Sequence, residues 1–434
     1  MAGNDNFVID RRQFILGASA ALAAGSFSLI PTSFAEAKSI GGIAVGGRPS
    51  AVAAQPSARL RFTERPMPIP PGSLSGGAAK LQELSEEAFS LIRLPEANEQ
   101  FPGIDGSGMA AAVIDTGVRP THQMFVLQGD SRIIKERNFS SENGGWADDA
   151  WDTHGHGSHV AGLIAGRELV VGGFSSGGVA PGAGLVSVKI LDRNGTGDLA
   201  ALARSLVWLR RWNGANGRTV TAVNLSLGDP GNYVSEADAL RRNQIFRTIS
   251  REIDRMIRQD VVVVCAAGNA YHYYQAEGLA FPAIMRQTVS VGAVFDSDLG
   301  PYTHPSGLWS ANAAANKIVP YSQRLSLANP GGTAVFAPGT HLISASHLSD
   351  TGLSTLQGTS QSAPIVTGAV LRAQQLYKSI TNRLPAPADV RSWLVQSMTT
   401  LDDGDDSVQN TGKHFPVLDL PQFLRTAEIA ARLP

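Results

Sequence analysis

Short apolar runs without polar alternation recur along the chain, and the segments between them carry apolar residues at helical spacing. A continuous run of about four to eight apolar residues is typical of a strand buried on both faces of a parallel sheet. Such runs occupy residues 109–114, 184–191, 220–227, 261–265 and 287–294. Helices are predicted near 80–94, 160–165, 198–212, 235–256, 365–377, 388–397 and 420–431. This order of elements favours the α/β class.

Three segments interrupt this succession of predicted strands and helices. Residues 38–77 are rich in Gly, Pro, Ala and Ser, which predicts a flexible linker. Residues 295–334 contain several prolines and are interpreted as an extended surface insertion. Residues 402–406 are acidic but lack the glycine position of an EF-hand loop, so a solvated loop is favoured over a calcium site.

The N-terminus has the organisation of a signal peptide. Arg11 and Arg12 precede a mildly apolar run that extends to about residue 30, and the small-residue stretch Ala35–Ala37 offers a cleavage site. Paired arginines before a phenylalanine resemble the bacterial twin-arginine signal. A transmembrane anchor is the alternative, but the run is short and diluted by Gly and Ser. We therefore expect residues 1–37 to be removed and the protein to be exported, to the periplasm or the medium.

Composition limits the alternatives further. With 434 residues, 43% of them hydrophobic and 17% charged, the chain can form one large α/β domain or two smaller ones. The net charge of −1 and the lack of a long basic run give no indication of nucleic-acid binding. The single cysteine, Cys265, excludes an intramolecular disulfide, and its place in an apolar run predicts a buried side chain.

Polar residues that could take part in catalysis lie at the ends of these elements. Asp115 ends the first strand, where an open parallel sheet places its active site, although a solvated turn is the alternative. His154, His156 and His159 are read as one general base with structural neighbours, because their spacing does not suit a zinc site. Asn269, just past a strand, is either a turn residue or an oxyanion donor.

Ser360 directly precedes a predicted helix. There the free N–H groups and the helix dipole favour developing negative charge, so the position suits a nucleophile. The alternative is an ordinary turn with a serine cap.

Two other motifs are rejected on context. Residues 195–200 fit the dinucleotide fingerprint G-x-G-x-x-A, but no acidic residue follows at the required distance. Residues 173–177 fit the G-x-S-x-G nucleophile elbow, but a loop follows where that motif needs a helix.

Four blocks together resemble the signatures of subtilisin-like serine peptidases. They are, in chain order, Val113-Ile114-Asp115-Thr116-Gly117, His156-Gly157-Ser158-His159-Val160-Ala161-Gly162, Ala266-Ala267-Gly268-Asn269 and Gly358-Thr359-Ser360-x-x-Ala363-Pro364. The resemblance extends over roughly residues 91–430. It implies a subtilisin-like α/β fold, with a mostly parallel central sheet and helices on both faces, in a catalytic domain of residues 89–434.

The resemblance also implies roles for individual residues. Ser360 would be the nucleophile, His156 its base and Asp115 the partner that orients the histidine. Asn269 would donate a side-chain N–H to the oxyanion, beside the backbone N–H of Ser360.

Residues of the substrate cleft follow from the same resemblance. Gly195 and Gly197 would bind an extended peptide on one side, and Ser226, Leu227 and Gly228 on the other. Ala266, Ala267 and Gly268 would complete the pocket for the residue before the scissile bond, with Ala280 near its base. Since none of these side chains is charged, we expect a preference for apolar or aromatic residues there.

The expected partners are polypeptide substrates, without nucleic acid and without stable membrane insertion after signal removal; the oligomeric state is not determined by the sequence. No cofactor is required. Calcium binding remains open, because the calcium-binding loops of the family are not recognisable and no metal ligand can be assigned.

The chain also departs from the family pattern. Residues 38–88 are short and rich in Gly and Pro for the folded propeptide of many secreted subtilisins, so they are a linker or a short pro-segment. Two alternative functions stay open: a non-catalytic peptide-binding or scaffolding protein on the same fold, and an acyl hydrolase acting on esters.

Overall fold

The computed structural model describes residues 85–212, 214–215, 217–304, 308–396, 399–404 and 410–433, together with the backbone of residues 59–61 and 67–68. The predicted signal peptide, residues 1–37, lies outside these ranges, as does most of the predicted linker. None of the helices within the described ranges is long and apolar enough to cross a membrane.

The centre of the fold is a seven-stranded sheet in the order β16-β13-β12-β11-β3-β9-β6. Every neighbouring pair in it is parallel. Five strands correspond to the predicted apolar runs, two of them extending one residue beyond the run: β3 (Ala110–Asp115), β9 (Gly184–Lys189), β11 (Ala222–Leu225), β12 (Val262–Ala266) and β13 (Val289–Val294). The outer strands β6 (Ile133–Asn138) and β16 (Val335–Pro338) were not predicted.

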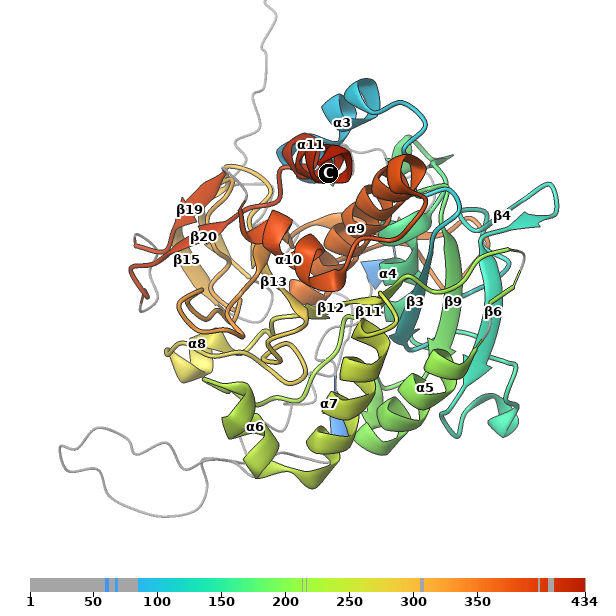
Figure 1. Cartoon of the computed structure of the whole chain (residues 1–434), viewed down its shortest axis with the longest axis horizontal. Helices are drawn as coiled ribbons and strands as arrows, with labels where there is room; N and C mark the ends of the chain where they lie inside the picture. The colour runs from blue at the N-terminus through green and yellow to red at the C-terminus, as the bar shows by residue number, and fades with distance from the viewer. Residues whose placement is uncertain are drawn as a thin grey trace, which may run out of the picture.

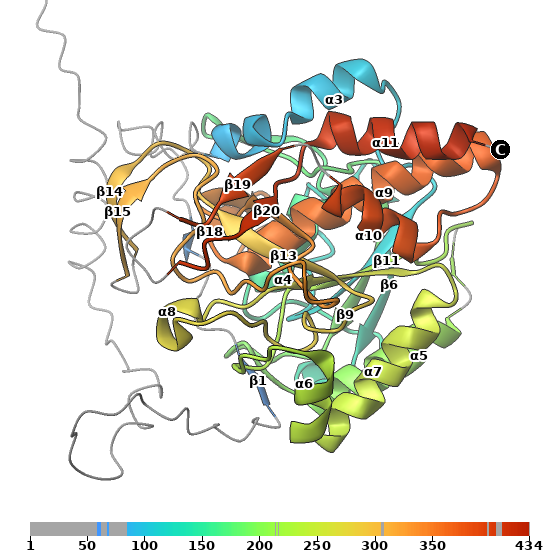
Figure 2. The same ribbon diagram turned by 60° about the vertical axis from the view of Figure 1, so that its left-hand side comes forward.

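Helices cover both faces of the sheet, as expected for the α/β class (Figures 1 and 2). One face carries α4 (His156–Ala165) and the long α9 (Thr359–Thr381), with α3 (Leu94–Gln100), α10 (Pro387–Val395) and α11 (Leu420–Arg432) around them. The other face carries α5 (Leu199–Arg211), α6 (Glu236–Arg242) and α7 (Gln244–Ile257).

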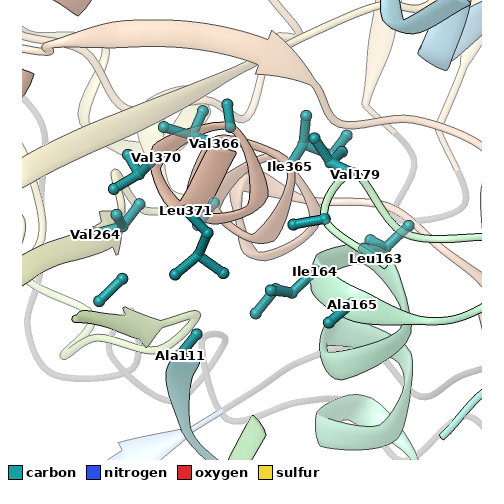
Figure 3. Packing of buried hydrophobic residues seen from close by; sticks show 14 of the residues in the cluster. Ala111, Leu163, Ile164, Ala165, Val179, Val264, Ile365, Val366, Val370 and Leu371 are labelled. Atoms are coloured by element: carbon teal, nitrogen blue, oxygen red, sulfur yellow. The ribbon is translucent and has the colours of Figure 1, made fainter. Parts of the chain in front are cut away.

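Alternate residues of each strand supply the two cores. In β3, Ala111 and Val113 join the cluster that contains α4 and α9, whereas Ala112 and Ile114 join the cluster of α5 and α7. Figure 3 shows how α9 meets α4 and the sheet in the first cluster. Because both faces of β3 are buried, a continuous apolar run is the sequence pattern that this strand requires.

The predicted helix at 235–256 is two helices. Ser235 caps the first by accepting a hydrogen bond from the Asp238 N–H at 3.1 Å, as the capping pattern predicts. Asn243 then leaves the helical conformation, and its side chain accepts a bond from the Ile245 N–H to start α7. An asparagine competes well for helix caps, which explains the break.

The interpretation of residues 295–334 as a surface insertion is wrong. This segment forms the hairpin of β14 (Gly300–Thr303) and β15 (Trp309–Ala313), and Phe295, Tyr302 and Tyr321 build a separate small core. The prediction failed because these aromatic residues follow neither a helical nor a strand period.

The expectation of a solvated loop at 402–406 is also wrong at its described end. Asp403 is buried and forms a bidentate ion pair with the buried Arg324, with distances of 2.8 and 2.9 Å. A buried carboxylate needs such a partner, which lies far away in the sequence and was not predicted. Asp405 and Asp406 lie outside the described residues.

Two short strands stand before the main domain, within the predicted linker. β1 (Arg59–Arg61) pairs antiparallel with β10 (Thr196–Asp198), and Leu60 lies opposite Gly197. β2 (Met67–Pro68) pairs antiparallel with β18 (Leu353–Leu356). β18 itself forms a hairpin with β17 (Leu342–Ala345), shortly before Ser360.

Candidate active site

The candidate site lies at the carboxyl edge of three neighbouring strands. Asp115 is the last residue of β3, Ser226 follows β11 directly, and Ala266 ends β12. This edge is where open α/β sheets place their sites, since all parallel strands end there.

Asp115 and His156 are in direct contact. The Nδ1 atom of His156 lies 2.9 Å and 3.0 Å from the two carboxylate oxygens of Asp115. His156 is the first residue of α4, and Gly155 before it has a φ of 103°, which suits glycine. The Asp115 side chain is fully buried and His156 is 3% exposed. When Nδ1 carries the hydrogen that is donated to the carboxylate, Nε2 is the basic nitrogen of the imidazole.

Ser360 is the second residue of α9. Its Oγ donates to the Ser226 carbonyl at 3.1 Å, and the Ser226 hydroxyl donates to the Ser360 carbonyl at 2.7 Å. Pro364 explains the second bond: a proline four residues on has no N–H to offer to the Ser360 carbonyl. The Ser226 hydroxyl supplies the missing donor. The serine side chain is thus placed at the start of a helix, where N–H groups without helical acceptors gather.

Asn269 is oriented by the residue next to Ser360. Its Oδ1 accepts bonds from the N–H of Thr359 at 3.0 Å and from the Thr359 hydroxyl at 2.8 Å. These two bonds fix the orientation of the amide, with Oδ1 directed at Thr359 and Nδ2 directed away from these two donors. A side chain at Gly358 would place its Cβ 3.1 Å from that Nδ2. The amide donor therefore lies at the start of α9, on a residue exposed to solvent.

The other histidines have structural surroundings. His159 is fully buried, and its Nε2 lies 3.0 Å from the Leu342 carbonyl. Burial lowers the pKa of His159 to about 3, so the ring is neutral. The His154 ring meets His156 edge to face, with centroids 6.4 Å apart. In the part of the chain that the structure describes, no three His, Cys, Asp or Glu side chains are grouped to hold a metal ion.

The predicted substrate-binding residues lie in two places: at β10, and in the segments that follow β11 and β12. Gly197 is in β10, whose free edge is taken by β1, and Gly195 lies just before it. Ser226, Leu227 and Gly228 follow β11, while Ala267 and Gly268 follow Ala266 of β12, so the two groups leave adjacent strands.

The base of the predicted pocket is apolar but has a carboxylate next to it. A Cβ on Gly228 would lie 3.2 Å from the Ala280 Cβ, which brings Ala280 against this wall. Asp229 is buried immediately after Gly228 and accepts bonds from the Tyr233 hydroxyl at 2.6 Å and the Phe281 N–H at 3.0 Å. Burial raises the pKa of Asp229 to about 6.

Both rejected motifs fall in other contexts. Residues 195–200 lead from β10 into α5, and Asp198 caps that helix. Ser175 lies in β8 (Phe174–Ser176), which forms a hairpin with β7 (Leu169–Val171) and is not followed by a helix. The nucleophile elbow is therefore absent at this serine.

Several supporting residues were not predicted. Asp152 and Thr116 link the two halves of the Asp115–His156 pair. The fully buried Lys189 donates to the Thr116 carbonyl at 2.6 Å and pairs with Glu142 at 3.2 Å. Although burial raises the pKa of Glu142, bonds from Arg193 and Thr153 lower it to about 2. The sequence feature that could have identified Lys189 is its place as a charged residue at the end of a buried strand.

Comparison with known proteins gives a consistent result. A family model described as the subtilase family matches residues 106–412. The "Major intracellular serine protease" of Bacillus subtilis (strain 168) is 28% identical over 319 residues, which cover 73% of this chain and 83% of that protein. Subtilisin DY of Bacillus licheniformis is 27% identical over 305 residues, covering 70% and 88%. The "Extracellular serine proteinase" of Thermus sp. (strain Rt41A) is 30% identical over 317 residues, covering 72% and 59%.

The family match extends over most of the chain and includes all four candidate residues. It begins before Asp115 and ends after Ser360. The parallel sheet with helices on both faces agrees with it. The chain belongs to the subtilase family, and it is a serine endopeptidase.

Proposed function

We propose that the chain hydrolyses peptide bonds with Ser360 as nucleophile, His156 as general base, Asp115 as the partner of the histidine and Asn269 as an oxyanion donor. The observation that carries this proposal is the pair of contacts between His156 Nδ1 and the Asp115 carboxylate. They orient the imidazole and set the tautomer in which Nε2, not Nδ1, accepts the proton.

The chemistry follows from these positions. The Ser360 Oγ attacks the peptide carbonyl carbon while His156 Nε2 takes its proton, and the imidazolium is stabilised by Asp115. The negative oxygen of the tetrahedral intermediate receives bonds from the Asn269 amide and the Ser360 N–H. His156 then gives the proton to the leaving amine. In the second half of the reaction water attacks the acyl group on Ser360, with His156 again taking and returning the proton, and Ser360 is released.

An extended peptide is the substrate conformation that the cleft supports. The edge of β10 accepts a strand from the chain itself, since β1 pairs with it through residues 59–61. β2 likewise pairs antiparallel with β18. A peptide substrate would add to these edges as an extra strand.

Residues 59–61 and 67–68 would therefore compete with substrate for the same edges. The enzyme is fully accessible only when this segment has left or has been removed. The mature N-terminus would then lie beyond Pro68, later than the predicted signal cleavage near Ala37. N-terminal sequencing of the active protein distinguishes the two positions.

We propose a preference for apolar or aromatic residues before the scissile bond. The pocket walls at Ser226–Gly228 and Ala266–Gly268 carry no charge, and the nearby Asp229 carboxylate already accepts two hydrogen bonds. A panel of chromogenic peptides that differ only at this residue measures the preference. Fastest cleavage after Lys, Asp or Glu would contradict it.

Export is proposed from the N-terminal sequence alone, through Arg11, Arg12 and the stretch Ala35–Ala37. The names of the relatives include both an intracellular and an extracellular protease. Fractionation of cells that express the full chain, compared with a variant in which both arginines are replaced by lysine, tests this proposal.

Casein hydrolysis by the wild type and by Ser360→Ala tests the function itself. We expect hydrolysis that depends on Ser360. Turnover of esters without peptides would favour an acyl hydrolase, and peptide binding without turnover would favour a binding protein.

A further inference from the structure

We infer that Asp152 is a positioning residue for the candidate catalytic pair, and that it acts through the hydroxyl group of Thr116. This inference rests on the proposed function of Asp115 and His156. Neither residue is part of the proposed triad, and Asp152 bonds to neither Asp115 nor His156 in the contacts described below.

The Asp152 carboxylate holds the loop that leads into α4. Its Oδ1 accepts bonds from the N–H groups of His154 and Gly155 at 2.9 Å and 2.8 Å. Its Oδ2 accepts bonds from the N–H and the hydroxyl of Ser158 at 2.9 Å and 2.7 Å. Asp152 is only 1% exposed. Residues on both sides of His156 are therefore bound to a single buried carboxylate.

Thr116 extends this network to the other half of the pair. Its hydroxyl donates to Asp152 Oδ1 at 2.9 Å and accepts the Gly157 N–H at 2.9 Å. Thr116 is covalently next to Asp115, and Gly157 is next to His156. One hydroxyl group thus connects the neighbours of the two residues that must remain in hydrogen-bond contact.

The two loops are also in close backbone contact. A Cβ on Gly157 would lie 2.0 Å from the Gly117 carbonyl oxygen, so only glycine allows this approach. The backbone contact sets the distance between the loops, while the Asp152–Thr116 bridge fixes their relative rotation. An error of about 1 Å in the placement of a catalytic group can cost about 10²-fold in rate.

The first test is Asp152→Asn. An amide in this place must direct its NH₂ group at donors on one side or the other, which leaves at least one N–H of the loop without its acceptor. We expect kcat to fall about 10²-fold, with KM within about twofold. KM should hold because Asp152 has no bond to β10 or to residues 226–228.

The second test is the pair Thr116→Val and Thr116→Ser. Valine keeps the shape but lacks the hydroxyl, so we expect kcat to fall as in Asp152→Asn. Serine keeps the hydroxyl and should recover most of that loss. The double variant Asp152→Asn/Thr116→Val should be little worse than either single variant, since both break one bridge.

Glu252→Gln is the matched control. Glu252 is a buried carboxylate on α7 that pairs with Arg210 at 2.9 Å, far along the chain from the candidate residues. Its loss should lower stability without a change in kcat. The Thr116 pair keeps the test decisive if Asp152→Asn does not fold.

Two results would overturn the inference: Asp152→Asn with the kcat of Glu252→Gln, or Thr116→Val and Thr116→Ser with equal kcat. A wild type without Ser360-dependent hydrolysis would instead contradict the proposed function, so the two failures are distinguishable.

Discussion

The two halves of the candidate site are held in different ways. Asp115 and His156 are fixed by side-chain bonds between two loops, with a buried carboxylate at the centre. Ser360 is fixed by its own helix and by an exchange of bonds with one residue, Ser226. The first half keeps a ring in one tautomer and one plane. The second half leaves a hydroxyl group that can rotate about a single bond.

This difference indicates a division of labour. The proposed base, His156, must hold its orientation while it gains and loses a proton at Nε2, so it needs a fixed partner at Nδ1. As the proposed nucleophile, Ser360 must leave its resting acceptor, the Ser226 carbonyl, when it attacks. Rigid support for the base and mobile support for the nucleophile are therefore compatible with one reaction.

The largest expected effect tests whether the two halves act as a unit. Ser360→Ala and His156→Ala should each lower kcat about a millionfold, the magnitude known for subtilisin, because neither residue is effective without the other. Single-turnover and steady-state assays with a peptide substrate measure this loss. If the double variant lost the sum of both effects, the halves would be independent and the comparison would fail.

A smaller effect is expected at Asn269, which belongs to the serine half. Asn269→Ala should lower kcat about 10²–10³-fold with little change in KM, because the amide bonds to the oxyanion only as charge develops. Asn269→Asp is the matched variant, since it keeps an oxygen for the Thr359 bonds but has no N–H to donate. Both should lose similar activity. Normal activity in Asn269→Asp would assign Asn269 a packing role.

A change in the access of substrate to the cleft should alter neither half of the candidate site. Deletion of the chain through Pro68 removes β1 and β2 from the edges of β10 and β18. We expect KM for peptides to fall about tenfold, from release of a segment that competes with substrate, while kcat stays the same. An increase in kcat at constant KM would mean that the segment acts on the catalytic residues.

The last prediction concerns stability, not activity, and the buried His159 on α4. His159 has its pKa lowered to about 3 by burial, below its ordinary value of 6.5. Between these values the unfolded chain binds a proton that the folded chain does not, so the contribution of His159 to stability is complete above pH 6.5 and is lost as the pH falls towards 3. The full loss corresponds to about 5 kcal/mol.

His159→Gln removes this titration but can still donate to the Leu342 carbonyl. We expect the variant to lose less stability than the wild type between pH 6.5 and pH 4, measured by urea unfolding. Parallel curves for the two proteins would show that His159 does not titrate in this range.

Much of the fold could be predicted because buried strands leave a strong pattern. β3 and β12 are continuous apolar runs, and both were located to within one residue at either end. β6 was not predicted, since its centre carries Lys135, Glu136 and Arg137 at the edge of the sheet. An edge strand is half solvated, so its composition resembles that of a loop.

The site shows the same limit. The four candidate residues were found because each stands at the end of an element, next to a signature block. The residues that support them depend on hydrogen bonds between distant parts of the chain. Thr116 bonds to Asp152 across 36 residues of sequence, and Lys189 bonds to Thr116 across 73 residues. Local pattern contains no information on such pairs before the fold brings them together.

The central claim is that Ser360 is a nucleophile activated by His156. The most direct measurement is labelling of the folded protein with a fluorophosphonate probe, followed by peptide mapping of the adduct. We predict one adduct, on Ser360, that is lost in Ser360→Ala and strongly reduced in His156→Ala. Absence of labelling in folded, full-length or truncated protein, or an adduct on another serine such as Ser175, would contradict it.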